Sequence, residues 1–205
     1  MRVLTRLLVA SRNAKKLAEL RRVLDAAGLA GLTLVSLDDV PPFDEAPETG
    51  ATFEANALAK ARDGYAATGL PTVADDSGIE VAALNGMPGV LSARWAGVHG
   101  DDGANNALLL AQLSDVPDER RAAAFVSACA LVWGPGDADS AVVRGAWPGV
   151  IARAPRGEGG FGYDPLFIPE GESRSAAELS PEEKDAASHR GRALALLIPA
   201  LRALV

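Results

Sequence analysis

Extended and helical patterns alternate along the first half of this chain, and two long extended segments follow one another in the second half. Residues 1–10 are interpreted as a first strand, and apolar residues at helical spacing follow it up to Gly28. Residues 121–133 and 140–147 are extended and mostly apolar, with a Gly-Pro-Gly-Asp turn after the first of them. We therefore expect an α/β fold in which a mixed β-sheet is flanked by helices.

The composition is that of an ordinary soluble protein and limits the classes of function. Of the 205 residues, 48% are hydrophobic and 23% are charged, which suits one compact domain or two closely joined lobes. No apolar run approaches the roughly 20 residues that a membrane span needs. The net charge of -7 argues against a general affinity for nucleic acid. Cys129 is the only cysteine, so no disulfide forms within one chain, and a cytoplasmic location is expected.

Two adjacent carboxylates and a hydroxyl follow the short apolar segment Leu70–Ala74. Residues 75–78, Asp-Asp-Ser-Gly, are interpreted as the end of a strand, and residues 79–84 as another short strand. Adjacent carboxylates bind Mg²⁺ together with substrate phosphates, and one of them could act as a base. Asp, Ser and Gly also favour helix caps and turns. From these residues alone, a cation site and a simple turn are both open.

A second polar junction lies where the first strand meets the first helix. Asn13 would cap this helix, and Lys15 and Lys16 fall in its first turns. The free amides at a helix start bind anions, whereas lysines there are unfavourable to the helix dipole unless an anion is present. The pattern favours phosphate binding, and a capped helix with solvated lysines is the alternative.

Glu48 lies near the end of a loop that contains three prolines and precedes a helix predicted over residues 52–67. Its carboxylate could stabilise the start of the helix, or it could supply a second oxygen ligand to a metal ion. Spacing does not separate these two roles.

Residues 156–167 contain four glycines around two aromatic residues, Phe161 and Tyr163. A segment so rich in glycine disfavours a helix or strand and is typical of a loop, which could present an exposed aromatic ring. Aromatic rings stack on nucleic-acid bases with roughly 1 to 3 kcal/mol per base. The alternative is a glycine-rich turn whose aromatic side chains pack inward.

A helix is predicted to begin at Ser180, because Ser180 and Glu183 form a capping box and a proline takes the first helical position. Lys184, Ser188 and Gly191 would share one face of this helix, with His189 and Arg190 beside it. These basic residues either contact a ligand or simply solvate the helix. A second apolar helix over residues 193–204 is expected to pack on the body of the protein.

Six motifs in order along the chain resemble those of the inosine triphosphate pyrophosphatase family, which hydrolyses non-standard purine nucleoside triphosphates such as ITP, dITP and XTP. The resemblance runs from Leu8 to about Leu201. Ser11 stands where threonine is commoner, and Arg12 stands where a small residue is often found. The motifs are Ser11-Arg12-Asn13-Ala14-Lys15-Lys16, Glu48-Thr49-Gly50, Asp75-Asp76-Ser77-Gly78, Gly86-x-Pro88-Gly89-x-x-Ser92-Ala93-Arg94, Phe161-Gly162-Tyr163-Asp164-Pro165 and Ser188-His189-Arg190-Gly191.

The resemblance implies a fold and a set of roles. It implies a single domain over residues 1–205 with an elongated mixed sheet, two lobes, a central cleft and a homodimeric assembly. It implies that Asp76 is the catalytic base or water-orienting group and that Asp76 and Glu48 bind Mg²⁺, with Asp75 nearby. The substrate-binding residues that it implies are Ser11, Arg12, Asn13, Ala14, Lys15, Lys16, Ser77, Phe161, Gly162, Tyr163, Asp164, Lys184, His189 and Arg190.

The implied substrate is a purine nucleoside triphosphate, cleaved to the monophosphate and pyrophosphate. Lys16 would hold the triphosphate, Phe161 would stack on the purine, and Arg190 would favour a 6-oxo over a 6-amino group. Two other functions are considered beside this one. The first is a related pyrophosphatase acting on modified pyrimidine or methylated nucleotides, and the second is a nucleotide-sensing module that binds ITP and leaves it intact.

Overall fold

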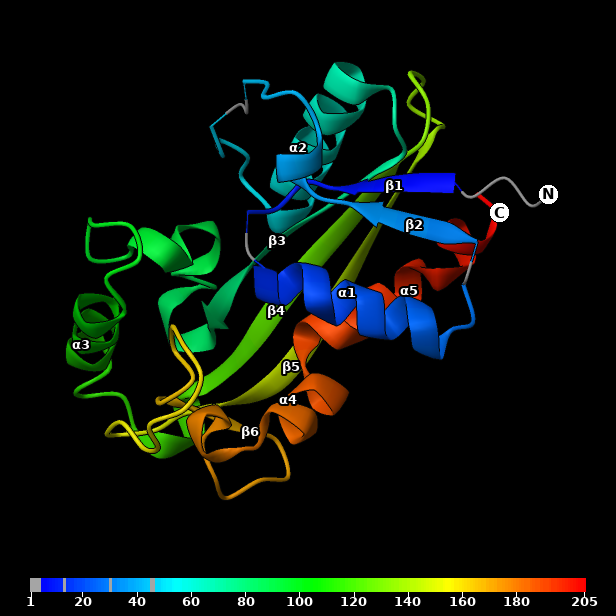
Figure 1. Cartoon of the computed structure of the whole chain (residues 1–205). Coiled ribbons are helices and arrows are strands. Elements are labelled where there is room, and N and C mark those ends of the chain that lie inside the picture. The colour runs from blue at the N-terminus through cyan, green and yellow to red at the C-terminus, as the bar shows by residue number, and fades with distance from the viewer. Residues whose placement is uncertain (1–4, 13, 30, 45–46) are drawn as a thin grey trace. The chain divides into compact units, whose positions relative to one another are not determined.

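The computed structural model describes residues 5–12, 14–29, 31–44 and 47–205. Within these residues six strands form one sheet in the order β2-β1-β3-β4-β5-β6 (Figure 1). β1 pairs in parallel with β2 and β3, whereas β5 and β6 pair antiparallel, so the expected mixed sheet is confirmed. The strands are β1 (Thr5–Val9), β2 (Leu32–Val35), β3 (Thr72–Val81), β4 (Ala122–Val132), β5 (Ser140–Ile151) and β6 (Phe167–Pro169).

α2 and α4 begin at residues whose side chains cap the first turn. The Thr52 hydroxyl accepts a hydrogen bond from the Ala55 amide at 3.1 Å, and Gly69 ends the same helix in a left-handed conformation. The capping box of Ser180 with Glu183 is present. The helices are α1 (Ala14–Ala26), α2 (Phe53–Thr68), α3 (Asp102–Gln112), α4 (Pro181–Ala187) and α5 (His189–Arg202). None of the helices within the described ranges is long and apolar enough to cross a membrane.

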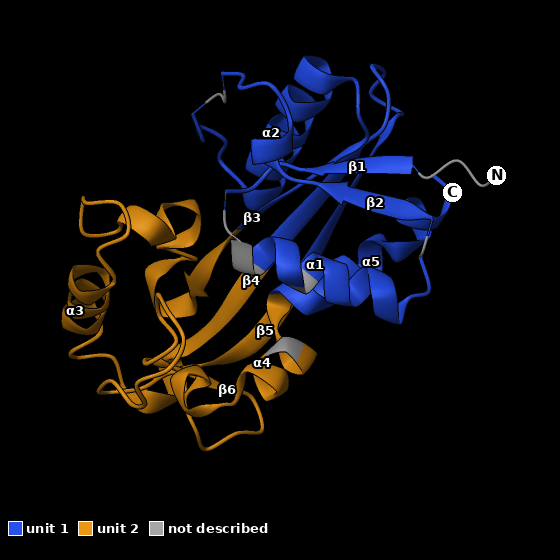
Figure 2. Cartoon of the chain, in the orientation of Figure 1, with its two compact units in different colours: residues 1–76, 127–145, 190–205 blue, residues 77–126, 146–189 orange. Residues whose placement is uncertain are grey.

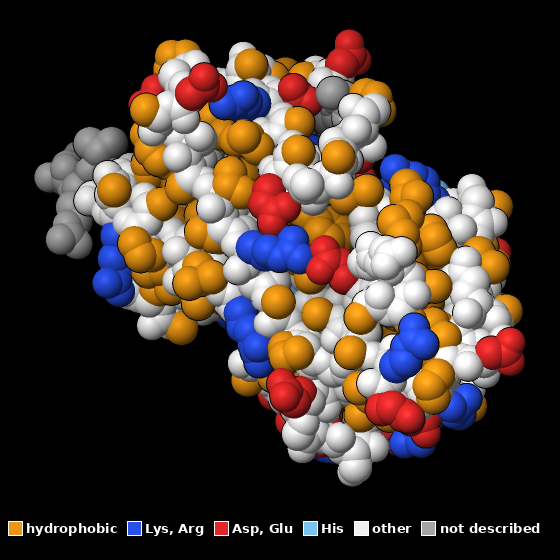
Figure 3. Space-filling view, turned by 180° about the vertical axis from the view of Figure 1, so that it is seen from behind, with side chains coloured by type: hydrophobic (Ala, Val, Ile, Leu, Met, Phe, Trp, Pro, Cys, Tyr) orange, Lys and Arg blue, Asp and Glu red, His pale blue; other side chains and the backbone are white. Residues whose placement is uncertain are grey.

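The chain divides into two compact units (Figure 2). Unit 1 comprises Met1–Asp76, Ser127–Gly145 and Arg190–Val205, and unit 2 comprises Ser77–Val126 and Ala146–His189. The expectation of one domain with two lobes and a central cleft stays a prediction. On the face shown in Figure 3, Lys and Arg side chains are interspersed with Asp and Glu side chains.

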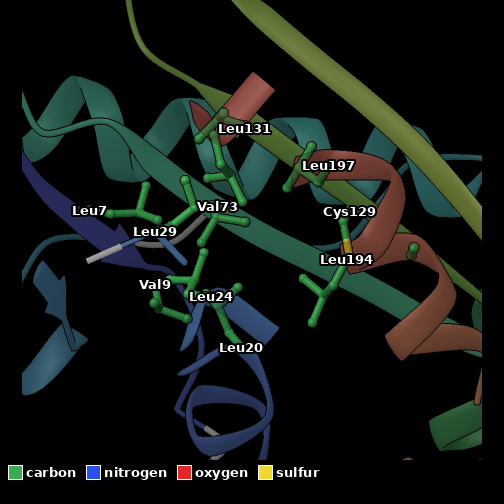
Figure 4. Packing of buried hydrophobic residues seen from close by; sticks show 12 residues of the cluster. Leu7, Val9, Leu20, Leu24, Leu29, Val73, Cys129, Leu131, Leu194 and Leu197 are labelled. Atoms are coloured by element: carbon green, nitrogen blue, oxygen red, sulfur yellow. The ribbon is translucent and has the colours of Figure 1, made fainter. Parts of the chain in front are cut away.

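Each unit has its own hydrophobic core. In unit 1, leucines of α1 and α5 pack with Leu7, Val73 and Cys129 of the sheet (Figure 4). In unit 2, Phe167 makes edge-to-face contacts with Phe125 and Trp147, at ring-centroid distances of 4.7 Å and 5.5 Å. Burial of large apolar side chains is the main favourable term in folding, so these two clusters stabilise the elements that carry the polar residues.

Residues 75–78 do not end a strand, and the turn considered for them is wrong. β3 continues through them from Thr72 to Val81, so the two short strands expected here form one strand of ten residues. Acids and glycine have low strand propensity, but propensity is weaker than tertiary context at a central strand. β3 lies between β1 and β4, and β1 pairs with its first two residues, Thr72 and Val73.

The helix expected over residues 180–191 is also corrected. α4 ends at Ala187, Ser188 is extended with ψ of 156°, and α5 begins at His189. Lys184 and Gly191 therefore do not share a helix face, because the helical period is interrupted between them. The expected apolar helix at the end of the chain is confirmed as α5.

Candidate active site

Asp75 and Asp76 have different surroundings because successive side chains of a strand point to opposite faces of the sheet. Asp75 shares its face of β3 with Val73, which packs against α1 and α5. Asp76 shares the other face with Thr72, which lies against Gly64 of α2. Two acids that are adjacent in sequence are thus separated by the sheet. One faces α1 and α5, and the other faces α2.

Asp75 is paired with two cations. Its Oδ2 atom lies 2.7 Å from Lys16 Nζ and 3.4 Å from Arg190 Nε. Burial raises the pKa of Asp75, but the charges of Lys16 and Arg190 outweigh burial and hold that pKa well below its usual range. A cavity of about 20 Å³ lies among these three side chains and Cys129, which is room for one water molecule. Asp75 therefore links the lysine of the phosphate motif to the arginine of the last motif.

Asp76 is buried and is held by α2. Its Oδ2 atom accepts a hydrogen bond from Asn56 Nδ2 at 2.9 Å. The Oδ1 atom of Asn56 accepts a hydrogen bond from the Gly50 amide at 2.7 Å, which fixes the Glu48-Thr49-Gly50 motif against the same helix. One partner of the Asp76 carboxylate is thus the side-chain amide of Asn56, which orients it on the α2 side of the strand.

Lys60 lies one helical turn after Asn56 and fixes Glu48. Its Nζ atom donates to Glu48 Oε1 at 2.8 Å and to the backbone carbonyl of Asp75 at 2.6 Å. Residues four apart on a helix lie on one face, so Asn56 and Lys60 together bring the Glu48 motif to the acidic strand. Neither residue was among those predicted from the sequence. Their four-residue spacing in an alanine-rich helix is the signal that could have identified them.

The donor set suits a hard cation. Over the described residues, no group of three or more His, Cys, Asp or Glu side chains is gathered at one point. Asp76 and Glu48 supply two carboxylates, and Mg²⁺ commonly takes one or two carboxylates and completes its shell with water and substrate phosphates. The side chains present are therefore compatible with Mg²⁺ that binds together with a phosphorylated substrate.

The phosphate motif follows β1 directly. Lys16 is in the first turns of α1, as predicted. Arg12 contributes to a cavity of about 220 Å³ whose other walls include Asp38 and Phe43. Asn13 lies outside the described residues, and the side chains of Ala14 and Lys15 are likewise outside them.

The aromatic loop in unit 2 presents Phe161, whose side chain is 49% exposed. The Phe161 amide donates to Asp164 Oδ2 at 2.8 Å, and Lys184 Nζ pairs with the same carboxylate atom. Lys184 Nζ also lies 4.7 Å from the centre of the Phe161 ring. Gly160 has a φ of +77°, and a Cβ there would collide with the Asp164 carboxylate, so the loop requires glycine at this position.

Tyr163 packs inward, whereas Phe161 is exposed. Of the two alternatives for this loop, the inward-packed ring therefore applies to Tyr163 and the exposed ring to Phe161. The Tyr163 hydroxyl donates to the Ser92 carbonyl at 2.8 Å. Burial raises the pKa of this hydroxyl, and the nearby charge of Asp102 adds to the shift. Tyr163 therefore anchors the loop, and only Phe161 offers a ring to a ligand within this pair.

His189 is buried and stacks on Phe125, with ring centres 5.0 Å apart and an angle of 14° between the planes. Ser77 belongs to β3 and directly follows Asp76.

Within unit 1 the structure brings together Lys16, Glu48, Asp75, Asp76 and Arg190 through the contacts above. Within unit 2 it brings together Phe161, Gly162, Asp164 and Lys184.

Comparison with known proteins identifies relatives over the whole length of the chain. The chain is 75% identical over 204 residues to the dITP/XTP pyrophosphatase of Mycobacterium bovis, which covers 100% of this chain and 98% of that protein. A crystal structure of a nucleoside-triphosphatase, or dITP/XTP pyrophosphatase, from Mycobacterium abscessus is 68% identical, with a TM-score of 0.82, and covers 96% of this chain and 100% of that chain.

A more distant structure has the same fold. The HAM1 protein from Coxiella burnetii is 41% identical, with a TM-score of 0.87, and covers 97% of this chain and 99% of that chain. The sequence pattern described as the Ham1 family matches residues 7–200. These matches span almost all of both units, and the chain belongs to the Ham1 family.

Proposed function

We propose that this protein hydrolyses the non-canonical purine nucleoside triphosphates ITP, dITP and XTP to the nucleoside monophosphate and pyrophosphate, and so removes them from the nucleotide pool. Its full-length similarity to dITP/XTP pyrophosphatases supports this function. The geometric observation that carries the proposal is the division of the acids of β3. Asp75 is paired with Lys16 and Arg190, and Asp76, on the opposite face of the strand, accepts a hydrogen bond from Asn56 of α2.

The triphosphate is held by Lys16 and by the amides that follow Ser11. A lysine side chain at the start of a helix adds a positive charge to the free amides there, which together attract phosphate. Asp76 and Glu48 would hold Mg²⁺, which neutralises charge on the phosphate oxygens when it is bound. Asn56 and Lys60 keep these two carboxylates in place before the substrate arrives.

In the reaction, the oxygen of a water molecule attacks the α-phosphorus of the nucleotide. The bond between that phosphorus and the oxygen bridging to the β-phosphate breaks, and pyrophosphate leaves with the bonding electrons. Asp76 orients the water and accepts its proton. General base catalysis of this kind contributes about 10² to 10⁴ in rate.

The remaining substrate-binding residues recognise the nucleoside and its base. Phe161 stacks on the purine, and Asp164 and Ser77 fix the nucleoside and phosphate. Lys184 contacts the phosphate or the base edge, and His189 and Arg190 read the base. An Arg190 donor suits the 6-oxo group of hypoxanthine and xanthine and opposes the 6-amino group of adenine. Replacement of Arg190 by alanine is expected to narrow the preference for ITP over ATP, measured as a ratio of kcat/KM values.

One assay tests the function. Pyrophosphate release is measured with ITP, XTP, dITP, GTP, ATP and dTTP in the presence of Mg²⁺ and again with a chelator. The proposal predicts release from ITP, dITP and XTP and its loss with the chelator. Preference for dTTP would support a pyrimidine-directed pyrophosphatase, and ITP binding without any product would support a sensing module.

The same proposal includes a homodimer and a cytoplasmic location, where the nucleotide pool lies. Light scattering coupled to gel filtration measures the mass of the assembly. A mass near twice the chain mass of 21.1 kDa is expected.

A further inference from the structure

The N-terminal part of α3 holds Gly162, the residue that follows the exposed Phe161. Asp102 Oδ2 accepts a hydrogen bond from the Gly162 amide at 2.6 Å. Asn106 Nδ2 donates to the Gly162 carbonyl at 2.8 Å. The two side chains are four residues apart, so they project from one face of the helix and hold the same loop residue from its two polar groups. Neither belongs to any of the six motifs.

These bonds act on the backbone around the aromatic ring. The peptide before Phe161 is held by Asp164, and the peptide after it is held by Asp102. Gly162 has a φ of +60°, a conformation that other residues adopt at a cost, and glycines lose more conformational freedom than other residues on being ordered. Without these bonds, the loop would have to be ordered when a ligand binds, which weakens binding.

α3 is itself fixed in unit 2 by packing and hydrogen bonds. Leu109 is fully buried in the core of unit 2, and Asp101 caps the start of the helix by accepting from the Ala104 amide at 2.9 Å. Asn105 accepts a hydrogen bond from the Ala96 amide at 2.7 Å and donates to the Ala93 carbonyl at 3.3 Å. The helix thus connects the aromatic loop to the hydrophobic core of unit 2.

We propose that Asp102 and Asn106 are positioning residues that hold the Phe161 ring ready for stacking, and so set the affinity for the base of the substrate but not for its phosphates. This inference rests on the proposed function, because it takes Phe161 as the surface on which the purine stacks. It adds two residues outside the family motifs to the determinants of substrate affinity.

The test compares a ligand that has a base with one that has none. Asp102→Ala and Asn106→Ala are prepared, with Asp115→Ala as a control that removes an exposed carboxylate just beyond α3. KM and kcat are measured with ITP, and inorganic tripolyphosphate is used as a competitive inhibitor. Each test variant is expected to raise KM for ITP by about three- to tenfold, as for the loss of one hydrogen bond. The value of kcat and the inhibition constant of tripolyphosphate should change less than about twofold, and the control should match wild type.

Asp102→Asn provides a rescue, because the amide oxygen can still accept from the Gly162 amide. It should return KM for ITP toward the wild-type value. An equal loss of affinity for ITP and tripolyphosphate would overturn the proposal, since it would indicate general damage to the site. Unchanged KM values in both alanine variants would overturn it as well.

Hydrogen exchange followed by mass spectrometry measures how well the backbone amides of the loop are protected, independently of enzyme activity. Peptides that cover residues 156–164 should exchange faster in Asp102→Ala than in wild type, while peptides from β4 should not change. Unchanged exchange in this loop would contradict the proposed anchoring even if the enzyme had another substrate. A wild-type protein that binds ITP but releases no pyrophosphate would instead contradict the proposed function, and the ratio of ITP to tripolyphosphate affinities would still test the positioning role.

Discussion

The acidic region of β3 and the aromatic loop of unit 2 are held in place by different means. Asp75 and Asp76 lie on a central strand, and their partners Lys16, Asn56 and Arg190 come from helices that pack on the sheet. Phe161 lies in an irregular segment whose backbone is fixed by single side chains. The acids are therefore positioned by regular elements, whereas the position of the exposed ring depends on a few side-chain to backbone hydrogen bonds.

The largest expected effect comes from Asp76→Asn. This change removes charge and basicity with little change in volume, so pyrophosphate release should fall by at least about 10³-fold. The melting temperature should stay close to that of wild type, because asparagine can still accept the hydrogen bond from Asn56. Turnover of ITP at the wild-type rate would refute the assigned role.

Asp75→Asn should act mainly on stability. It leaves Lys16 and Arg190 without their shared counter-charge, and breaking a buried ion pair in this way costs about 3 kcal/mol. The depressed pKa of Asp75 means that its contribution is complete above the ordinary value of 3.8 and is lost as the pH falls below it. Urea unfolding of both proteins should therefore differ at neutral pH and converge in acid. A constant difference across this range would show that the charge of Asp75 is not responsible.

Phe161→Ala should weaken substrate binding and leave stability almost unchanged, which is the reverse of the effect expected for Asp75→Asn. The ring is 49% exposed, so its removal should hardly change the free energy of unfolding. KM for ITP should rise about tenfold, which is the lower part of the range for loss of a stacked base. Phe161→Tyr is the matched control and should bind ITP like wild type. A large loss of stability in the alanine variant would remove the contrast between the two regions.

The smallest effect is expected at Cys129 of β4, the strand beside β3. Burial raises the pKa of its thiol to about 12, and the charge of Asp75 contributes to this shift. Iodoacetamide at mildly alkaline pH should therefore leave the folded protein unmodified and alkylate the urea-unfolded chain. Rapid alkylation of the folded protein would indicate that this part of unit 1 opens readily.

Several helices were predicted correctly because capping residues and apolar spacing mark them in the sequence. The capping box located α4, and the helical spacing of apolar residues located α1, α2 and α5. The course of β3 was missed because acids and a glycine interrupt its apolar pattern, although neighbouring strands hold it in the sheet. The break at Ser188 was missed because the helical spacing continues across it in the sequence.

The candidate site was predicted to the extent that motifs mark it. Asn56, Lys60 and Asp102 carry no such mark, and their importance depends on residues that are distant in the chain, such as Glu48 and Gly162. The spacing of residues along one element is visible in the sequence. Which face of that element packs against another is decided only by folding.

The sequence by itself determined the mixed α/β class, the family, and the residue types available for holding phosphate, a cation and a base. Only the tertiary structure decided which side chains surround each of the two adjacent acids, because the alternation of a strand sends their side chains to opposite faces. On one face Asp75 meets Lys16 and Arg190, and on the other Asp76 meets Asn56. The surroundings of the two acids differ because folding brings different helices to the two faces of the strand.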